Sequence, residues 1–164
     1  MKPTTIVTRL PIAASGERVW NSLMFYESIE EPPPLHLRLM LPRPIRTQGS
    51  KSAVGDQATC LYEGGHLLKR VTRIDRGRLY EFSVVEQRLN VGKGVRLSGG
   101  SYSLRELPGG GTELSIMTRF LSRNRPRWLL QPIEAGACHL FHRHLLGAIG
   151  RKAAAAAAAA AQAR

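Results

Sequence analysis

Apolar and polar residues alternate along most of the chain, and this alternation predicts a protein rich in β-strands. Thr4 to Ile12 alternates well enough to form one strand, with Ile6, Leu10 and Ile12 on the same side. Five further strands are expected between glycine- and proline-containing turns, at about 56–62, 66–75, 78–88, 96–107 and 112–121. Strands this closely spaced predict an antiparallel meander.

Two other segments have the spacing of helices. Ser15 can cap a short helix whose apolar positions are Val19, Trp20, Leu23 and Met24. After Pro126 a long helix is expected to run to about Lys152, with Pro132 marking a kink or a later start.

The segment between the short helix and the meander is expected to be irregular. Three consecutive prolines, 32–34, end any helix that precedes them. Leu35 to Leu41 alternates with polar residues, so it is expected to be extended or to form an exposed apolar lip. Pro42 to Ser52 is expected to be a loop.

The order of these elements predicts the fold. A strand, short helices, a meander and one long final helix indicate an α+β protein, with a curved antiparallel sheet of six to seven strands wrapped around the long C-terminal α-helix. With 164 residues, 43% of them apolar, the chain is expected to form a single domain at 1–152. The alanine-rich tail at 153–164 is expected to prolong the helix or to be disordered.

The chain carries a formal charge of +12, from 24 basic and 12 acidic residues. Such an excess attracts nucleic acid, anionic lipid or acidic ligands. The basic residues are spread out, and few aromatic residues lie between them to stack on bases, so a solvated basic surface is the preferred interpretation. Nucleic acid is therefore not favoured as a partner, whereas docking to an anionic membrane surface stays open.

The two cysteines and the N-terminal residues indicate the cellular compartment of the protein. Cys60 and Cys138 form neither a metal-type spacing nor a disulfide framework, which fits a reducing compartment. Arg9 and Pro11 interrupt the apolar stretch near the N-terminus, so no signal peptide is expected there. No segment approaches the roughly 20 apolar residues that cross a bilayer, apart from the alanine tail, which is too short. The sequence therefore predicts a cytoplasmic protein.

Two motifs, together with the element order, carry a resemblance to a known family. They are Pro11 to Trp20, which reads as the end of a first strand and the entry to a helix, and Gly110 to Ser115, a turn into the last strand. With these features the chain resembles the START/SRPBCC superfamily of helix-grip proteins, which includes the birch-pollen allergen group and the polyketide cyclase/dehydrase-like proteins. The resemblance spans roughly residues 4–150.

The resemblance implies a cavity between the sheet and the last helix that takes apolar small molecules. Members of the superfamily include lipid carriers, hormone receptors, cyclases and hydrolases, so the resemblance specifies the fold better than the activity. It supplies no family-wide catalytic set that could be transferred to this chain.

A two-residue loop at Arg76-Gly77 would decide which residues of the flanking strands face such a cavity. The inward set would then be Leu67, Lys69, Val71, Tyr80, Phe82, Val84 and Glu86. A three-residue loop would reverse this parity. Lys69 and Glu86 would lie diagonally across the strand pair, either as a structural bridge at the cavity mouth or as a ligand anchor.

The last hairpin shows an asymmetry in side-chain size. If Leu107 faces Thr112, small residues of one strand oppose large residues of the other: Gly99, Ser101 and Ser103 opposite Phe120, Thr118 and Ile116. This arrangement would leave room for the closing helix or for a ligand. Gly99-Gly100 within a strand indicates a bulge or a close backbone approach.

One histidine falls within the apolar stripe of the long helix. The stripe comprises Leu130, Ile133, Ala137, Leu140, Phe141, Leu145 and Ala148. His144 lies among these residues, whereas His139 and His142 point elsewhere. In a cavity His144 could transfer a proton or bond a ligand oxygen, or it could only bond a sheet hydroxyl such as that of Tyr80, Tyr102 or Thr118. No metal site is expected at these histidines, because no third ligand lies nearby.

The leading hypothesis is a protein that binds or carries an apolar or amphipathic small molecule. The expected apolar wall is Leu67, Val71, Phe82, Val84, Ile116, Phe120 and Leu140, and Lys69, Glu86, Tyr80 and His144 would orient the ligand. The rival hypothesis is a cyclase- or hydrolase-type enzyme in which His144 and Glu86 act as acid and base. No cofactor is expected, and the chain is expected to be a monomer or a homodimer.

Overall fold

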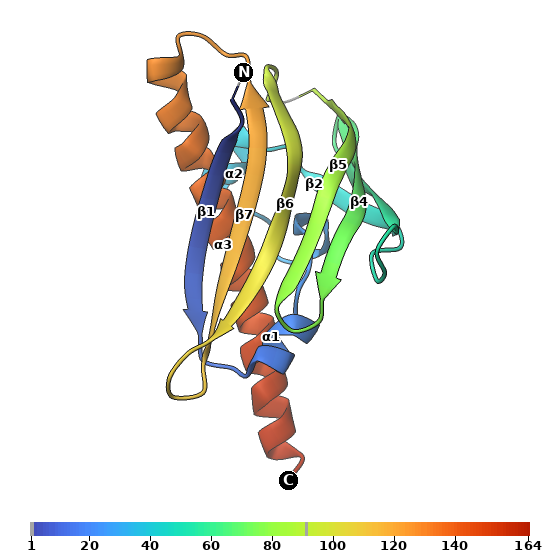
Figure 1. The fold of residues 1–164 in the computed structure, drawn as a ribbon, viewed down its shortest axis with the longest axis vertical. Coiled ribbons are helices and arrows are strands. Elements are labelled where there is room, and N and C mark those ends of the chain that lie inside the picture. The colour runs from blue at the N-terminus through green and yellow to red at the C-terminus, as the bar shows by residue number, and fades with distance from the viewer. Residues whose placement is uncertain (1, 91) are drawn as a thin grey trace.

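Seven strands form one antiparallel sheet in this computed structural model, which describes residues 2–90 and 92–164. The strands are β1 (Thr4–Ile12), β2 (Pro44–Gly49), β3 (Gln57–Tyr62), β4 (Gly65–Asp75), β5 (Leu79–Leu89), β6 (Val95–Glu106) and β7 (Thr112–Ser122). Their order across the sheet is β1-β7-β6-β5-β4-β3-β2, so the first strand in sequence pairs with the last (Figure 1). The five strands expected from the meander are confirmed, with bounds within one residue of the prediction.

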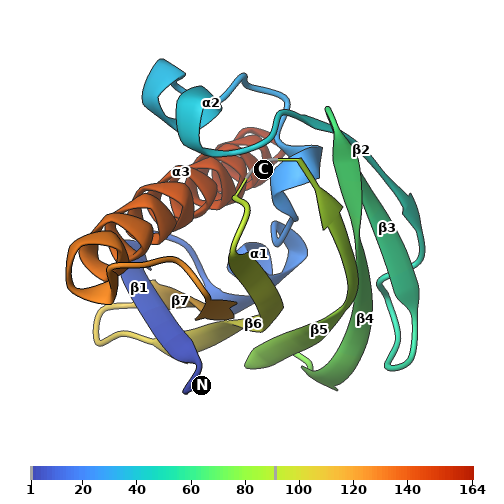
Figure 2. The same cartoon turned by 90° about the horizontal axis from the view of Figure 1, so that it is seen from above.

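The helices lie on the concave side of this sheet. They are α1 (Gly16–Asn21), the short 3₁₀ helix η1 (Tyr26–Ser28), α2 (Leu35–Met40) and the long α3 (Arg127–Gln162). Figure 2 shows the sheet curving from β1 round to β2, with α3 running along the open side and α2 beside it. This is the α+β helix-grip architecture expected above. No helix among the described residues is long and apolar enough to cross a membrane.

The core forms where α3 meets β1, β7 and α1. Leu146 and Ile149 of α3 are fully buried, as are Val19 of α1 and Leu114 of β7. Each such side chain contributes about 1.5–3 kcal/mol by leaving water. The alanine-rich segment continues α3 to Gln162, and Ala153 in it is still fully buried, so the helix is anchored beyond the end expected from its apolar stripe.

Two expectations for the region before the meander are wrong. Leu35 to Leu41 is not extended, since residues 35–40 form the helix α2 with Leu37 buried; the alternative of an exposed apolar lip agrees with Leu35 and Leu39, which are 71% and 79% exposed. The expected loop from Pro42 to Ser52 contains β2, which pairs with β3 as the edge strand of the sheet. Backbone pairing with a neighbouring strand stabilises this segment, which lacks a buried face of its own.

Bulges set the parity of the β4–β5 hairpin. The connecting loop has three residues, since Asp75 pairs with Leu79. Without a bulge, a loop of this length would turn the residues predicted to face the cavity toward the outer side of the sheet. A bulge between Val71 and Arg73 restores the predicted parity, so that Lys69 pairs with Val84. A second irregularity lies between Leu68 and Lys69, and it places Glu86 opposite Leu68 on the outer face of the sheet.

The register of the β6–β7 hairpin differs by one residue from the expected one. Glu106 pairs with Thr112, so Tyr102 and Gly100, not the serines, lie opposite Ile116 and Thr118. The predicted irregularity at the glycine pair is confirmed, because the register shifts between Leu97 and Gly99. A side chain at Gly100 would come within 2.6 Å of the Met117 carbonyl oxygen and 3.0 Å of the Phe82 ring, so this position requires close backbone approach.

Candidate ligand-binding cavity

A cavity of about 390 Å³ lies between the concave face of the sheet and α3. The strands contribute the apolar residues Leu67, Phe82, Val84, Leu97, Ile116 and Phe120 to its wall, and α3 contributes Ile133, Ala137, Phe141 and Leu145. Five of the seven predicted wall residues therefore line it: Leu67, Phe82, Val84, Ile116 and Phe120. Its volume lies within the range of small-molecule sites in proteins.

Aromatic rings from several elements surround this space. They are Tyr26, Tyr62, Phe82, Tyr102, Phe120 and Phe141. The rings of Tyr26 and Phe141 meet edge to face, with their centroids 5.2 Å apart, which closes the wall between η1 and α3. The cavity can therefore contact a ligand through ring edges and faces as well as through aliphatic groups.

Lys69 brings a positive charge to the cavity wall. Its Nζ lies 3.5 Å from Oε1 of Glu27 and 4.2 Å from the ring centroid of Phe25. Burial by itself would lower the pKa of Lys69, but the Glu27 carboxylate, together with Cys60 and Tyr102, raises it above its ordinary value. The ammonium group is therefore charged, although its side chain is only 10% exposed.

Glu27 is the buried partner that sequence reasoning missed. Its side chain is fully buried, and Oε1 accepts hydrogen bonds from the Tyr62 hydroxyl and from Lys69. Its second oxygen, Oε2, has no partner among the described residues. The carboxylate thus retains hydrogen-bonding capacity beside the cavity wall. Glu27 precedes the proline run in a segment without apolar periodicity, so no sequence signal marked it as buried.

Tyr102 and Cys60 are two further polar residues near the Lys69–Glu27 pair. The Tyr102 hydroxyl donates to the Met24 carbonyl oxygen at 2.9 Å, which ties β6 to the segment before η1. Burial raises the pKa of the Cys60 thiol to about 11. Cys60 is consequently a neutral thiol at ordinary pH.

A second polar group lines the cavity near the β5–β6 turn. Ser122 Oγ and Asn124 Nδ2 donate to Oε1 of Glu134, at 2.7 and 2.8 Å. Asn124 and Glu134 line the cavity together with Gly92 and residues 40–42 of the α2–β2 connection. The polar contacts of the cavity thus come from two separate groups, with the apolar wall between them.

His142, not His144, is the buried histidine of α3. It is fully buried, with Thr8 Oγ1 2.8 Å from Nδ1 and Thr118 Oγ1 2.8 Å from Nε2. Burial lowers the pKa of His142 to about 4, so the ring is neutral. Thr118 lines the cavity as expected, but its hydroxyl bonds His142.

His144 is not the buried, cavity-facing histidine that was expected, although Ile133, Ala137, Phe141 and Leu145 of the same predicted stripe do line the cavity. The face toward the sheet carries His142, Leu146 and Ile149. His144 packs edge to face on Tyr26, with ring centroids 6.2 Å apart, and does not line the cavity. Burial, and secondarily Arg151, lowers its pKa.

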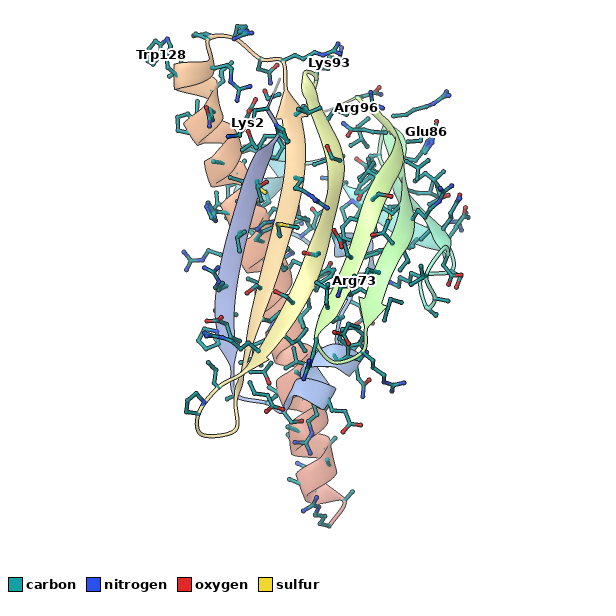
Figure 3. The ribbon with its side chains drawn as sticks, viewed as in Figure 1. Lys2, Arg73, Glu86, Lys93, Arg96 and Trp128 are labelled. Atoms are coloured by element: carbon teal, nitrogen blue, oxygen red, sulfur yellow. The ribbon has the colours of Figure 1, made fainter. Side chains whose placement is uncertain are left out.

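Four other predicted residues lie away from the cavity wall. Leu140 is 40% exposed, and Ser103 is exposed. Ser101 is buried but faces the opposite side of β6 from Tyr102. Glu86 lies on the outer face, where it pairs with Arg88 and lies 3.4 Å from His66 (Figure 3). His144 and Glu86 are thus not brought together, and the expected acid–base pair does not exist.

Val71 and Tyr80 face inward, but they lie outside the cavity lining. Val71 is 3% exposed and contributes to packing. Tyr80 contacts the Phe25 ring and donates from its hydroxyl to the Lys51 carbonyl oxygen at 2.8 Å. Within residues 2–90 and 92–164, no group of three or more His, Cys, Asp or Glu side chains is placed to hold a metal ion.

Comparison with known proteins finds similarity in structure. No family model matches the chain, and no curated protein matches it. The structure of Ara h 8.0201 matches with a TM-score of 0.58 at 10% identity, over 94% of this chain and 99% of that one. The ZhuI aromatase/cyclase from a Streptomyces strain matches with a TM-score of 0.59 at 13% identity, over 92% and 96%.

A third similar structure is norcoclaurine synthase from Thalictrum flavum, solved in complex with dopamine and hydroxybenzaldehyde. It matches with a TM-score of 0.60 at 14% identity, over 92% of this chain and 86% of that one. At such identities the likeness shows the fold alone. The helix-grip fold expected from the START/SRPBCC resemblance is confirmed.

Proposed function

We propose that this protein binds an apolar or amphipathic small molecule in the cavity between its sheet and α3. The observation that carries the proposal is the combination of a 390 Å³ apolar-walled space with the charged Lys69 in its wall. Apolar pockets with a few convergent polar groups are the usual form of small-molecule sites. The free thiols of Cys60 and Cys138 support a reducing compartment such as the cytoplasm.

The cavity favours a ligand that contains a ring and an oxygen that accepts a hydrogen bond. A cavity of about 150 Å³ is sufficient for benzene, so the larger space here accommodates more than one ring. The Lys69 ammonium group can donate to a ligand oxygen, while Glu27 balances its charge. The norcoclaurine synthase structure holds dopamine and hydroxybenzaldehyde, which supports small oxygenated aromatic compounds as a ligand class for this fold.

Filling the cavity tests the proposal directly. Ala137 lines the cavity and Leu140 on the same helix is exposed, so Ala137→Phe is the test variant and Leu140→Phe is its matched control. Native mass spectrometry of gently purified protein and titration with the fluorescent probe anilinonaphthalene sulfonate measure ligand retention and uptake. We expect Ala137→Phe to weaken probe binding about tenfold and to abolish any retained mass, with Leu140→Phe unchanged. Equal binding by wild type and Ala137→Phe would contradict the proposal.

The role of Lys69 can be tested with two probes that differ by one hydroxyl. The double variant Lys69→Met, Glu27→Gln removes both charges and so avoids leaving one of them buried alone. We expect this variant to bind naphthalene as well as wild type does and to bind naphthol about tenfold more weakly. Equal loss for both probes would show that Lys69 supports the cavity shape and does not contact the ligand.

An enzyme is the second candidate function, and one observation favours it. The buried Glu27 carboxylate has one oxygen without a partner in the described part of the chain, and it lies beside Lys69 and Tyr62, a grouping suited to proton transfer. Wild type and Glu27→Gln, purified from the same host, would be compared by native mass spectrometry. A ligand mass retained only by the variant, with a different mass in wild type, would indicate turnover. The same mass in both would indicate binding alone.

A further inference from the structure

Apolar side chains are exposed at the end of the molecule where α3 begins. Trp128 is 79% exposed, Ile133 is 55% exposed and Leu129 is 45% exposed. Ile133 also lines the cavity, so this exposed surface borders the ligand space. Leu140 is exposed farther along α3, and the other exposed aliphatic residues, such as Val54 between β2 and β3, belong to different elements. A cluster of large exposed apolar side chains marks an interaction surface more reliably than single residues do.

Basic side chains surround these apolar residues. Arg123 and Arg125 precede α3 and are exposed, and Lys93 and Arg96 are exposed on the adjacent β5–β6 turn and β6. The two segments touch, because the Arg123 amide donates to the Gly94 carbonyl oxygen at 2.8 Å. Figure 3 shows Trp128, Lys93, Arg96 and Lys2 at the same end of the molecule.

The segments 91–104 and 120–133 at this end carry only basic charges, and the carboxylates near them are paired: Glu134 accepts from Ser122 and Asn124, and Glu86 pairs with Arg88. Neither residues 91–104 nor residues 120–133 contain an aspartate or a glutamate. Arg96 and Arg123 line a hollow of about 510 Å³ between the ends of β6 and β7, which offers two guanidinium groups to an anionic head group. We call the surface formed by Lys93, Arg96, Arg123, Arg125, Trp128, Leu129 and Ile133 the α3 rim.

We propose that the α3 rim docks on the surface of an anionic lipid bilayer. Tryptophan prefers the interface of a bilayer, and leucine and isoleucine can enter the boundary between head groups and acyl chains. The arginines and the lysine would contact lipid phosphates at the same depth. This combination of an exposed tryptophan, aliphatic residues and clustered basic side chains matches the chemistry of a membrane surface.

Two other occupants fit the α3 rim less well. A nucleic acid would use the basic groups but would leave Leu129 and Ile133 exposed to water without a role. A second copy of this chain would bring two basic rims together, and like charges repel. The inference goes beyond the proposed function and does not depend on it, although docking at the rim would present the cavity-lining Ile133 to the bilayer.

The test uses vesicles of phosphatidylcholine alone and vesicles that also contain phosphatidylglycerol. The chain has two tryptophans, so the change Trp20→Phe makes Trp128 the only reporter. We expect this protein to sediment with the phosphatidylglycerol vesicles at low salt, with a blue shift of its tryptophan emission. Binding should weaken steeply as salt is added. Absence of sedimentation at low salt, or an unshifted emission of bound protein, would overturn the proposal.

Matched variants separate the rim from general charge. Arg96→Gln removes a rim charge and Arg73→Gln removes an exposed charge from the outer face of β4 (Figure 3). Trp128→Ser and Val54→Ser form the corresponding apolar pair. We expect about fivefold weaker vesicle binding for Arg96→Gln and about tenfold for Trp128→Ser, with little change in the controls. Equal losses in the test and control variants would overturn the proposal.

The alternative occupants give different outcomes in the same set of proteins. Tighter binding to a DNA duplex than to the vesicles, insensitive to Trp128→Ser, would replace the membrane with a nucleic acid. A dimer in analytical ultracentrifugation that Trp128→Ser dissociates would replace it with a second copy. Vesicle binding by the cavity-filled Ala137→Phe variant keeps the two proposals distinguishable, because it supports docking even if ligand uptake fails.

Discussion

Two buried polar groups flank the core of this protein, and they differ in what they leave unsatisfied. Between α3 and the strands β1 and β7, His142 is neutral and both of its ring nitrogens are bonded to threonine hydroxyls. Around Lys69, whose ammonium group pairs with Glu27, the second Glu27 oxygen has no partner among residues 2–90 and 92–164. Burial alone therefore does not identify a binding group. Unused hydrogen-bonding capacity next to a cavity does so better, because a satisfied group has nothing to offer a ligand.

Breaking the Lys69–Glu27 pair should have the largest effect on stability. Lys69→Met leaves the Glu27 carboxylate buried without its cation, and we expect a loss of about 3–5 kcal/mol in the free energy of unfolding. The double variant Lys69→Met, Glu27→Gln should recover most of this loss. Urea unfolding of the three proteins measures both effects. A single variant as stable as wild type would show that the pair is not buried as described.

Lowering the pH should destabilise the protein mainly through His142. The pKa of His142 is lowered from 6.5 to about 4, so below pH 6.5 the unfolded chain binds more protons than the folded one. The contribution of His142 is therefore complete above pH 6.5 and is lost as the pH falls toward 4, by roughly 3 kcal/mol. Urea unfolding between pH 7 and pH 4 measures this slope. We expect His142→Gln to be less stable at pH 7 but to have a flatter slope, and an unchanged slope would exclude His142 as its origin.

Removing the Tyr62 hydroxyl should show how much its hydrogen bond to Glu27 contributes to stability. Tyr62→Phe takes away the donor to Oε1 and leaves Lys69 as the remaining partner. We expect a loss of about 2 kcal/mol, since hydrogen bonds to charged groups contribute about 1.5–3 kcal/mol. Thermal unfolding with Tyr80→Phe as the control measures it, because the Tyr80 hydroxyl bonds a backbone carbonyl outside the cavity lining. Equal losses in the two variants would mean that the charge of Glu27 is unimportant.

The smallest effect is expected at His144, which belongs to neither group. His144→Ala removes a ring that packs on Tyr26 outside the cavity, and its Nε2 makes no hydrogen bond to any residue that the structure describes. We expect less than about 1 kcal/mol in stability and no change in probe uptake. Fluorescence titration with anilinonaphthalene sulfonate checks the second point. A clear loss of uptake would place His144 in contact with the ligand after all.

The candidate site was predictable where local pattern and burial agree. Leu67, Phe82 and Val84 alternate along their strands, so their shared face could be inferred once the hairpin parity was correct. Glu86 lies four residues from Phe82 on the same strand, yet an irregularity between them moved it to the outer face. Glu27 could not be inferred, since it reaches the cluster from a single turn of 3₁₀ helix whose position depends on the surrounding chain.

The sequence by itself determined the order of β1, the five meander strands and α3, and with it the helix-grip fold, because apolar periodicity and turn residues act locally; it did not predict α2 or β2. Only the tertiary structure decided which faces point inward. Side chains alternate with a period of two along a strand, so one extra residue in a bulge reverses every position beyond it. The burial of His142 in place of His144 likewise depends on tertiary contacts, because the Thr8 and Thr118 hydroxyls that bond its ring nitrogens lie far from it in sequence.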